Sequence, residues 1–288
     1  MDRKFRGAVR GSEKPLFFRE IRTPFKRFKQ VCYMAYTLGI DIGSGFSKAV
    51  ICEDGIVRSH AIAPSGGNYR ETADKVIQEA LDKIHISSKD ILRTVATGYG
   101  AAMVGFSDRT ATDISCHALG VHHLFPAART VIDIGHQFSK AIRLDDIGGT
   151  INFLLNEKCA GGSGKFLQII ARILHIDIDE IGPLSMTSSK PVQFTTGCAV
   201  FAESEAVSRI AEGALAGDIL AGVHKAMAAK IINLVTRLGL EEACVVTGGG
   251  AKDLGLVKTI ESELGVPVFV PDEPQITAAI GSALMART

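Results

Sequence analysis

Two segments of the chain repeat the same order of apolar and polar positions. In each, a short apolar run ends in an aspartate, glycine and other small or polar residues follow, and a second apolar run begins. The segments span residues 37–50 and 131–142. Two apolar runs separated by a short break that contains glycine are typical of a β-hairpin. The pattern therefore predicts two hairpins, with Gly43 and Gly45 in the first turn and Gly135 in the second.

The two predicted hairpins are also related in sequence. When Asp41 is aligned with Asp133, 92 residues later, both segments read D-I-G-x-x-F-S-K-A and share seven of the nine positions. Chance repetition at that length is improbable, and self-similarity of this kind indicates a duplicated unit. We therefore predict an α/β protein built from two related halves.

The turns carry candidate chemistry. The backbone N–H groups of a tight glycine turn converge on one concavity, which favours an anion such as a phosphate. Lys48 and Lys140 would add positive charge nearby. Asp41 and Asp133 stand at the strand ends, where a carboxylate can hold a hydrated Mg²⁺ or orient a water molecule. The alternative is a pair of ordinary hairpins in which these residues are structural.

A third glycine cluster favours the ligand-binding interpretation. Residues 243–247 have the composition of a buried strand, which runs into Gly248, Gly249 and Gly250, and a helical pattern follows over residues 253–264. Glycines between a strand and a helix permit close backbone approach to a ligand. The spacing is not G-x-G-x-x-G, so a dinucleotide-binding fold is not indicated.

Composition narrows the class of protein. The length of 288 residues suits two modest domains, and no stretch reaches the roughly 18 consecutive apolar residues that a membrane helix needs. Tryptophan is absent and aromatic residues make up 6% of the chain, so stacking on nucleic acid is not favoured. We expect a cytoplasmic protein that binds neither membrane nor nucleic acid.

Residues 1–35 differ from the rest of the chain. They contain ten Lys and Arg residues but three Asp and Glu residues, and they lack the apolar stretch of a signal peptide. Such a composition is typical of a basic, flexible extension. Translation from Met34 and a partner-docking arm are the other interpretations.

Two of the six cysteines have unusual surroundings. With no export signal, a disulfide framework is not expected. Cys159 and Cys198 each stand just ahead of a helical pattern, the second of which includes the apolar residues Phe201, Val207 and Ile210. The unpaired N–H groups and positive dipole end of a helix start lower the pKa of a thiol.

The other candidate ligands are less favoured. The remaining cysteines, which lie in the basic segment or in apolar runs, read as packing or surface thiols; they are Cys32, Cys52, Cys116 and Cys244. His117, His122 and His123 lie in a helical segment without an acidic or cysteine partner at suitable spacing, which predicts a surface or capping role.

Three segments resemble a known family. They are NEKCAGGSGKFLQIIA (156–171), TGCAVFAESEAVSRIAEG (196–213) and VVTGGGAKDLG (245–255). With the two hairpins, they are similar to the actin, Hsp70 and sugar-kinase superfamily, and within it to the ATPases that activate 2-hydroxyacyl-CoA dehydratases or serve as ATP-binding subunits of benzoyl-CoA reductases. The resemblance runs from about Tyr36 to the C-terminus.

The resemblance implies duplicated ribonuclease-H-like domains with a nucleotide in the cleft. Residues 36–128 would form the first, with the helix of 273–288 packing back on it, and residues 129–272 the second, with both cysteines. Asp41 would order Mg²⁺ and Asp133 would position water. The implied ATP-contacting residues are Gly43, Ser44, Gly45, Lys48, Gly135 and Gln137 at the phosphates and Gly248, Gly249, Gly250 and Glu203 at the adenosine.

The resemblance also implies a metal cluster. A 4Fe–4S cluster usually has four cysteine ligands, and Cys159 with Cys198 supplies two, so the cluster would be shared with a homologous ATPase subunit or a second copy. Zinc is the competing metal, but zinc sites favour close C-x₂₋₄-C pairs, which this sequence lacks.

The main functional expectation is an ATP-binding, iron–sulfur subunit of benzoyl-CoA reductase. Two short motifs look closer to the smaller ATP-binding subunit of that enzyme than to a dehydratase activator. They are Gly135-His136-Gln137-Phe138 and the C-A-G-G-S-G of residues 159–164. It would couple ATP hydrolysis to electron transfer from reduced ferredoxin to catalytic subunits that reduce the aromatic ring in anaerobic degradation. Three alternatives stay open: a homodimeric activator of a 2-hydroxyacyl-CoA dehydratase, a small-molecule kinase of the superfamily, and a non-catalytic nucleotide-dependent scaffold.

Overall fold

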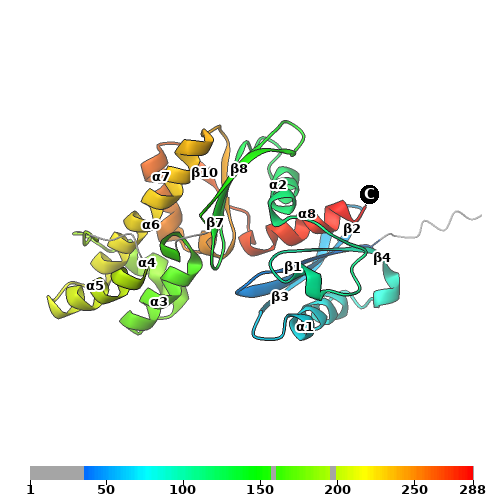
Figure 1. Ribbon diagram of the computed structural model, residues 1–288, viewed down its shortest axis with the longest axis horizontal. Helices are drawn as coiled ribbons and strands as arrows, with labels where there is room; N and C mark the ends of the chain where they lie inside the picture. The colour runs from blue at the N-terminus through cyan, green and yellow to red at the C-terminus, as the bar shows by residue number, and fades with distance from the viewer. Residues whose placement is uncertain (1–35, 157–159, 195–198, 288) are drawn as a thin grey trace, which may run out of the picture. The chain divides into compact units, whose positions relative to one another are not determined.

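The computed structural model describes residues 36–287, apart from residues 157–159 and 195–198. In this region the chain forms two five-stranded sheets, each covered by helices (Figure 1). Strand residues alternate between the two faces of a sheet, so each apolar strand can contribute to a core on both sides. In the first sheet, Ile51 packs on the α1 side, whereas Val50 and Cys52 pack on the α8 side.

The first half begins with the predicted hairpin. Its elements are β1 (Tyr36–Ile42), β2 (Phe46–Glu53), β3 (Ile56–Pro64), α1 (Tyr69–Asp82), β4 (Ile91–Thr97) and β5 (Arg109–Thr110). The sheet order is β3-β2-β1-β4-β5, in which β1 to β3 form an antiparallel meander and β4 and β5 run parallel to β1. The first predicted hairpin is therefore confirmed as β1–β2.

The second half repeats this connectivity. Its elements are β6 (Thr130–Ile134), β7 (Ser139–Leu144), β8 (Thr150–Asn156), α3 (Gly164–Leu174), α4 (Ile181–Ser185), α5 (Ala199–Ala211), α6 (Ala216–Leu238), β9 (Cys244–Thr247), α7 (Leu254–Leu264) and β10 (Val268–Phe269). The sheet order is β10-β9-β6-β7-β8, with β9 parallel to β6 and the meander antiparallel. The predicted duplication and the predicted α/β class are confirmed.

Two helices exchange places between the halves. The helix α2 (Asp113–Leu124) follows β5, but its Ala118 and Val121 share a core with Val131 and Ile142 of the second sheet. The helix α8 (Thr277–Met285) follows β10 and packs on β1, β2 and β4 of the first sheet. The sequence interpretation placed residues 36–128 in the first half, whereas the core contacts of α2 associate this helix with the second sheet.

The two exchanged helices pack closely against each other. A Cβ atom at Gly281 would overlap the carbonyl oxygen of Cys116, and a Cβ atom at Gly120 would overlap that of Thr277. Side chains at these two positions would force the helix backbones apart. The glycines therefore set the separation of α2 and α8 where the chain passes from one half to the other.

The helix α6 is the longest in the described residues. By length and composition it could cross a membrane, and it is the one helix of the described region that passes this test. More than half of its most apolar window is buried inside the protein, where Ile219, Val223 and Met227 contribute to the core of the second half. This is the environment of a core helix.

Candidate phosphate-binding site

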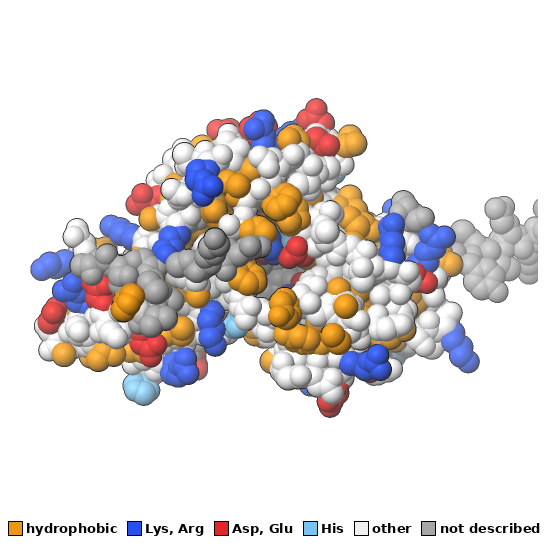
Figure 2. All heavy atoms as spheres, in the orientation of Figure 1, with side chains coloured by type: hydrophobic (Ala, Val, Ile, Leu, Met, Phe, Trp, Pro, Cys, Tyr) orange, Lys and Arg blue, Asp and Glu red, His pale blue; other side chains and the backbone are white. Residues whose placement is uncertain are grey.

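A cavity of about 770 Å³ lies between the hairpin turns of the two halves. The surface is hollowed between the halves in Figure 2. All but one of the predicted nucleotide-site residues line this cavity: Asp41, Gly43, Ser44, Gly45, Lys48, Asp133, Gly135, Gln137, Gly248, Gly249 and Gly250. The exception is Glu203, which is exposed on α5 and is not among the lining residues. The structure therefore does not bring Glu203 together with the others.

The two hairpin turns have the same geometry. The backbone N–H of Gly43 donates to the carbonyl of Phe46 at 3.0 Å, and that of Gly135 donates to the carbonyl of Phe138 at 2.9 Å. A Cβ atom at either glycine would lie within 2.9 Å of the same acceptor oxygen. Each turn thus requires glycine, because any side chain would collide with the bond that closes the turn.

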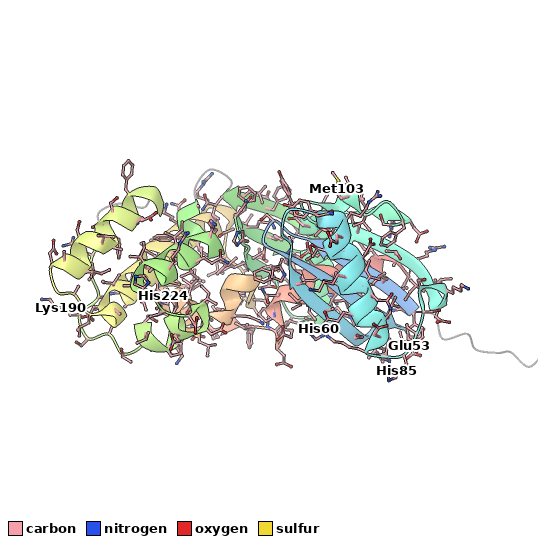
Figure 3. The ribbon with its side chains drawn as sticks, turned by 90° about the horizontal axis from the view of Figure 1, so that it is seen from below. Glu53, His60, His85, Met103, Lys190 and His224 are labelled. Carbon is pink, nitrogen blue, oxygen red and sulfur yellow. The ribbon has the colours of Figure 1, made fainter. Side chains whose placement is uncertain are left out.

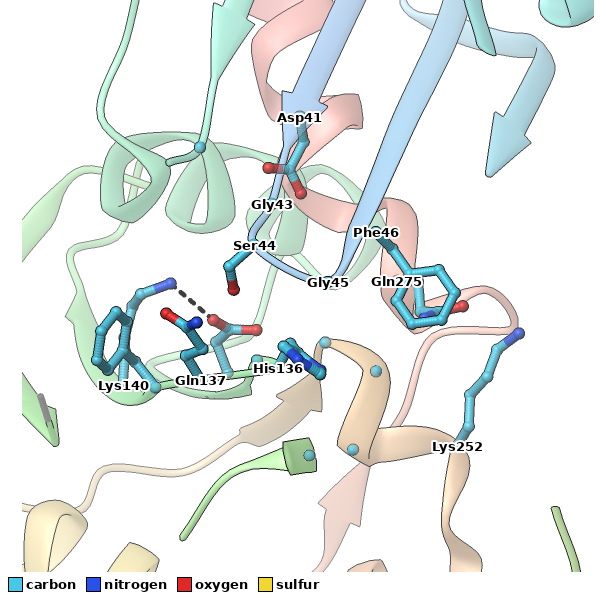
Figure 4. A pocket seen from close by; sticks show the side chains of 18 of the residues that line it. Asp41, Gly43, Ser44, Gly45, Phe46, His136, Gln137, Lys140, Lys252 and Gln275 are labelled. Carbon is cyan, nitrogen blue, oxygen red and sulfur yellow. Dashed lines mark hydrogen bonds and ion pairs between the residues drawn. The ribbon is translucent and has the colours of Figure 1, made fainter. Parts of the chain in front are cut away.

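Each turn also has an aspartate–lysine pair at its base. Asp41 pairs with Lys48 across the antiparallel ladder, and Asp133 pairs with Lys140 in the same way. The Lys48 Nζ to Asp41 Oδ2 distance is 2.7 Å. The Lys140 Nζ to Asp133 Oδ2 distance is 2.8 Å, and Figure 4 marks an ion pair at Lys140 with a dashed line. Each lysine therefore holds one carboxylate oxygen in a fixed direction at the cavity wall.

The sequence analysis missed the counterpart of the late glycine loop. Residues 97–101 read T-G-Y-G-A and residues 247–251 read T-G-G-G-A, and both follow a strand parallel to the hairpin. Gly98 and Gly248 have φ angles of +87° and +83°. A Cβ atom at either position would overlap Oδ1 of the aspartate in its own half. The T-G-x-G-A match was the signal that could have revealed this loop.

Comparison with known proteins agrees with this geometry. The family described as the BadF/BadG/BcrA/BcrD ATPase family matches residues 38–286. The chain belongs to this ATPase family. It is 41% identical over 253 residues to the 2-hydroxyisocaproyl-CoA dehydratase activator of Clostridioides difficile, and the alignment covers 87% of this chain and 94% of that relative. The family resemblance drawn from the sequence is confirmed.

A solved structure supports the same assignment. The activator of the 2-hydroxyisocaproyl-CoA dehydratase from Clostridium difficile with bound ADPNP superposes with a TM-score of 0.84 at 39% identity, over 87% of this chain and 94% of that one. A ROK family glucokinase from Streptomyces griseus reaches a TM-score of 0.56 at 14% identity, over 88% and 99% of the two chains, and shows the fold alone. The predicted superfamily fold is confirmed.

The comparisons favour a different branch of the family from the one expected. A benzoyl-CoA reductase subunit of Thauera aromatica is 33% identical over 262 residues, covering 87% of this chain and 93% of that relative. This identity is lower than the 41% found for the dehydratase activator. The similarity therefore supports the alternative named above better than the main expectation.

In this ATPase, Asp133 has a second buried neighbour that the sequence analysis set aside. His117 is 5% exposed, lines the cavity and places Nε2 3.5 Å from Asp133 Oδ2. The predicted surface or capping role is wrong for His117, because it lies on the face of α2 that packs toward the second sheet. Lys140 also forms an ion pair with Asp113, with 2.7 Å between Nζ and Oδ2.

Burial and charge set the protonation of this group. Burial lowers the pKa of His117, and the nearby carboxylate of Asp133 only partly offsets this, so the imidazole is neutral near pH 7. Burial alone would raise the pKa of Asp133, but His117 and Lys140 outweigh it and hold that pKa below its usual range. Burial would lower the pKa of Lys140, but Asp133 and Asp113 raise it overall. Asp133 is therefore ionised and acts as an acceptor only.

The second turn is bonded to the start of α3. The backbone N–H of Gly164 donates to the carbonyl of Gly135 at 2.9 Å, and the N–H of Lys165 donates to the carbonyl of His136 at 2.7 Å. The Ser139 hydroxyl donates to the carbonyl of Gly162. Two N–H groups at the start of α3 are thus satisfied by the second hairpin turn itself. The structure joins the cavity to the segment that follows Cys159.

The two candidate cluster ligands, Cys159 and Cys198, lie outside the described residues. The described chain resumes with a 3₁₀ turn at Ala160–Gly162 after the first and with α5 after the second. Among the described residues, no group of three or more His, Cys, Asp or Glu side chains could hold a metal ion.

The three described cysteines have a different character. Burial raises the pKa of Cys52 to about 11 and the pKa of Cys116 and Cys244 to about 12. All three side chains are free and buried. Since a metal–sulfur cluster is held by thiolates, these neutral thiols do not suit it.

The helix predicted after Cys198 is confirmed as α5 (Ala199–Ala211). Ala202 and Ala206 face the core, whereas Phe201, Val207 and Ile210 are 66%, 52% and 41% exposed. These three apolar side chains are therefore exposed on the helix that begins directly after Cys198.

Part of the cavity wall is formed by the 3₁₀ turn Ile178–Glu180, by α4 and by the start of α7. Ile178, Pro183 and Leu254 give it an apolar surface. Asp253 caps α7 by accepting a bond from the N–H of Leu256 at 3.0 Å, and its other oxygen lies 2.9 Å from Nε2 of His224 on α6. His224 is labelled in Figure 3. This buried pair, which the sequence analysis also missed, fixes the wall to the core helix.

Proposed function

We propose that this ATPase is the ATP-hydrolysing activator of a 2-hydroxyacyl-CoA dehydratase and acts as a homodimer. The observation that carries the proposal is the pair of matched turns whose aspartates, Asp41 and Asp133, face one cavity. Family membership and the 41% identity to a dehydratase activator support the choice of reaction.

The phosphates of ATP would lie between the two turns. Residues 44–45 and 136–137 line the cavity, and their backbone N–H groups would offer donors to a polyphosphate, whereas the N–H groups of Gly43 and Gly135 close the turns. The adenosine would lie toward Gly248–Gly250 and the apolar wall of α4 and α7. Lys48 and Lys140, which are bonded to aspartates, would act on the phosphates through their charge while positioning the carboxylates.

The two aspartates would have different roles. The side chain of Asp41 is 10% exposed and forms an ion pair with Lys48 through Oδ2, so its other oxygen can accept bonds from the water shell that Mg²⁺ keeps. Asp133 is 3% exposed and held by both Lys140 and His117. It would accept a hydrogen bond from the attacking water and orient it toward the terminal phosphate.

A 4Fe–4S cluster would be held by Cys159 and Cys198 of this chain and the same residues of a second copy. The buried thiols of the three described cysteines, whose pKa values are raised by burial, are poorer candidates than these two. The exposed apolar residues of α5 offer a surface for the second copy. When bound, the cluster would supply the low-potential electron, received from reduced ferredoxin, that a dehydratase partner requires.

The bonds between the second turn and α3 suggest how hydrolysis reaches the cysteines. Gly135 and His136 are backbone acceptors for the first turn of α3, so a shift of this turn moves the helix start with it. Residues 160–162 connect that helix start to Cys159. We propose that loss of the terminal phosphate alters this connection, and with it the arrangement of the two halves.

A reductase subunit is the second candidate. The 33% identity to a benzoyl-CoA reductase subunit over 87% of the chain favours it. Its partner would be a homologous ATPase subunit and catalytic reductase subunits in place of a second copy and a dehydratase. Anaerobic purification that yields a homodimer would exclude it.

The proposal is tested with three variants purified without oxygen. Asp41→Asn should lower Mg²⁺-dependent ATP hydrolysis by about 100-fold, on the order of the loss of one charge-positioning group, while ADP binding persists. Cys198→Ala should lose the iron while it still binds ATP, whereas the matched control Cys244→Ala should keep both. Iron content that is equal in Cys198→Ala and wild type would refute the cluster assignment, and unchanged hydrolysis in Asp41→Asn would refute the phosphate site.

A further inference from the structure

His136 lies where the two phosphate loops meet. It lines the cavity, and its ring packs against Gly45 of the opposite loop (Figure 4). A Cβ atom at Gly45 would lie 2.5 Å from Cγ and 2.8 Å from Nδ1 of His136. The imidazole is therefore a direct contact between the two halves, made across the cavity from one turn to the other.

The two loops differ at this position. Ser44 is the residue of the first loop that aligns with His136, and the flanking Asp-Ile-Gly and Phe-Ser-Lys-Ala are identical in both copies. The duplication therefore offers an internal reference, since a short hydroxyl side chain occupies the same place in a turn of the same geometry. A planar ring that extends beyond its loop is specific to the second copy.

The backbone of the same residue is bonded to α3. The carbonyl of His136 accepts from the N–H of Lys165 at 2.7 Å, and the preceding carbonyl of Gly135 accepts from the N–H of Gly164 at 2.9 Å. One residue thus contacts the opposite half through its side chain and the start of α3 through its backbone. A ligand that moves the ring has a short path to the helix that follows Cys159.

The chemistry of the ring suits a phosphate. Burial lowers the pKa of His136, and the positive charges of Lys165 and Lys48 lower it further. The ring is therefore neutral near pH 7. A neutral imidazole keeps one N–H donor, and a phosphate oxygen is a strong acceptor. The end of the cavity where hydrolysis would occur is marked by Asp41 and Asp133, and His136 follows Asp133 by three residues.

We propose that His136 binds the terminal phosphate of the nucleoside triphosphate and passes its presence to the first turn of α3. This inference rests on the proposed ATPase site and deepens it by naming the residue that separates triphosphate from diphosphate. The ring leaves its contact with Gly45 and donates to the phosphate, which lies between the two loops. After hydrolysis the imidazole N–H has no phosphate acceptor between the loops, and the ring returns to its contact with Gly45.

The test compares binding of ADP and of the slowly hydrolysed analogue AMPPNP. His136→Ser places the first-loop residue in the second loop, His136→Gln keeps a donor of similar reach, and His123→Ser removes an exposed histidine of α2 as a control. We expect the dissociation constant for AMPPNP to rise about tenfold or more in His136→Ser, as for loss of one hydrogen bond to a charged group. ADP binding should change less than twofold, and His136→Gln should recover most of the loss.

A second readout follows the helix. In wild type, AMPPNP should slow amide hydrogen exchange at Gly164 and Lys165 more than ADP does, and this difference should vanish in His136→Ser but persist in His123→Ser. Equal loss of affinity for both nucleotides, or an unchanged exchange difference, would overturn the inference while leaving the ATPase site intact. If wild type bound neither nucleotide, the proposed function itself would fail, and the inference with it.

Discussion

Replacement of Gly248 by alanine should destabilise the protein strongly. Gly248 has a φ of +83° and a ψ of 177°, a region of backbone space that residues with a Cβ atom essentially do not adopt. A Cβ atom there would also overlap Oδ1 of Asp133 and the carbonyl oxygen of Ile134. Both effects act in the same direction, because relief of the strain would require the loop to move onto the aspartate.

The size of the effect follows from these two contributions. Backbone strain of this kind costs about 1–3 kcal/mol, and forcing an extra carbon into a packed site costs about 1–3 kcal/mol more. The free energy of unfolding should therefore fall by about 4 kcal/mol. For a chain of this size, about 2–4 °C of Tm corresponds to each kcal/mol, so Tm should fall by about 8–16 °C.

Gly265 provides a matched control. It also has a positive φ, +70°, but its ψ is 15° and no atom lies within 4 Å of a Cβ atom placed there. Gly265→Ala should cost only the left-handed conformation, about 1–2 kcal/mol. The comparison separates the general cost of a positive φ from the crowding at Asp133.

Urea unfolding of both variants measures the difference. The denaturation midpoint of Gly248→Ala should fall well below that of Gly265→Ala, with the m value unchanged in both. Under conditions in which both variants are folded, Gly248→Ala should bind nucleotide less tightly than wild type, whereas Gly265→Ala should bind it normally. Equal midpoints for the two variants would refute the argument that the loop and Asp133 share a tightly fitted space.

Two further predictions concern the buried histidine and the exchanged helices. Burial lowers the pKa of His117 in the folded protein below the value of about 6.5 that a histidine has in the unfolded chain. As the pH falls below 6.5, the unfolded chain therefore binds a proton at this histidine before the folded protein does. The free energy of unfolding should fall with it, by up to about 1.4 kcal/mol per pH unit. In His117→Gln the urea midpoint should change less between pH 7.5 and 5.5 than in wild type, and an identical change would contradict this. Gly281→Ala should lower the free energy of unfolding by about 1–3 kcal/mol, because its Cβ atom would overlap the carbonyl oxygen of Cys116. The control Gly67→Ala, which has open space around its Cβ atom, should have a thermal unfolding midpoint close to that of wild type. Similar midpoints for the two variants would show that α2 and α8 can separate freely.

The sequence predicted what local patterns determine. A repeated motif identified the hairpins, because a turn that must bring N–H groups together requires glycine at fixed positions. The helix α3 was predicted from the apolar pattern that follows Cys159, and α7 from the helical pattern over residues 253–264. The superfamily fold followed from the resemblance of these motifs.

The contacts between distant segments could not be predicted in the same way. His117 looked like a surface residue, because its helical segment alone does not show that its partner is Asp133 in the next sheet. The apolar pattern after Cys198 predicted a helix but not which residues of α5 face the core, and that contact is made by Ala202 and Ala206. The position of α2 on the second sheet was also hidden, because a helix is usually assigned to the strands that precede it.

The exchange of α2 and α8 has a consequence for synthesis of the protein. Domains generally fold as units while the chain emerges from the ribosome, N-terminal part first. Here one face of the first sheet, with Val50 and Cys52, packs in the described residues against Ile276 and α8, which are translated after the entire second half. Until residues 277–285 have been translated, this apolar face of the first half would lack its packing partner. Nascent chains should therefore depend on chaperones, and an isolated fragment that ends before α8 should aggregate.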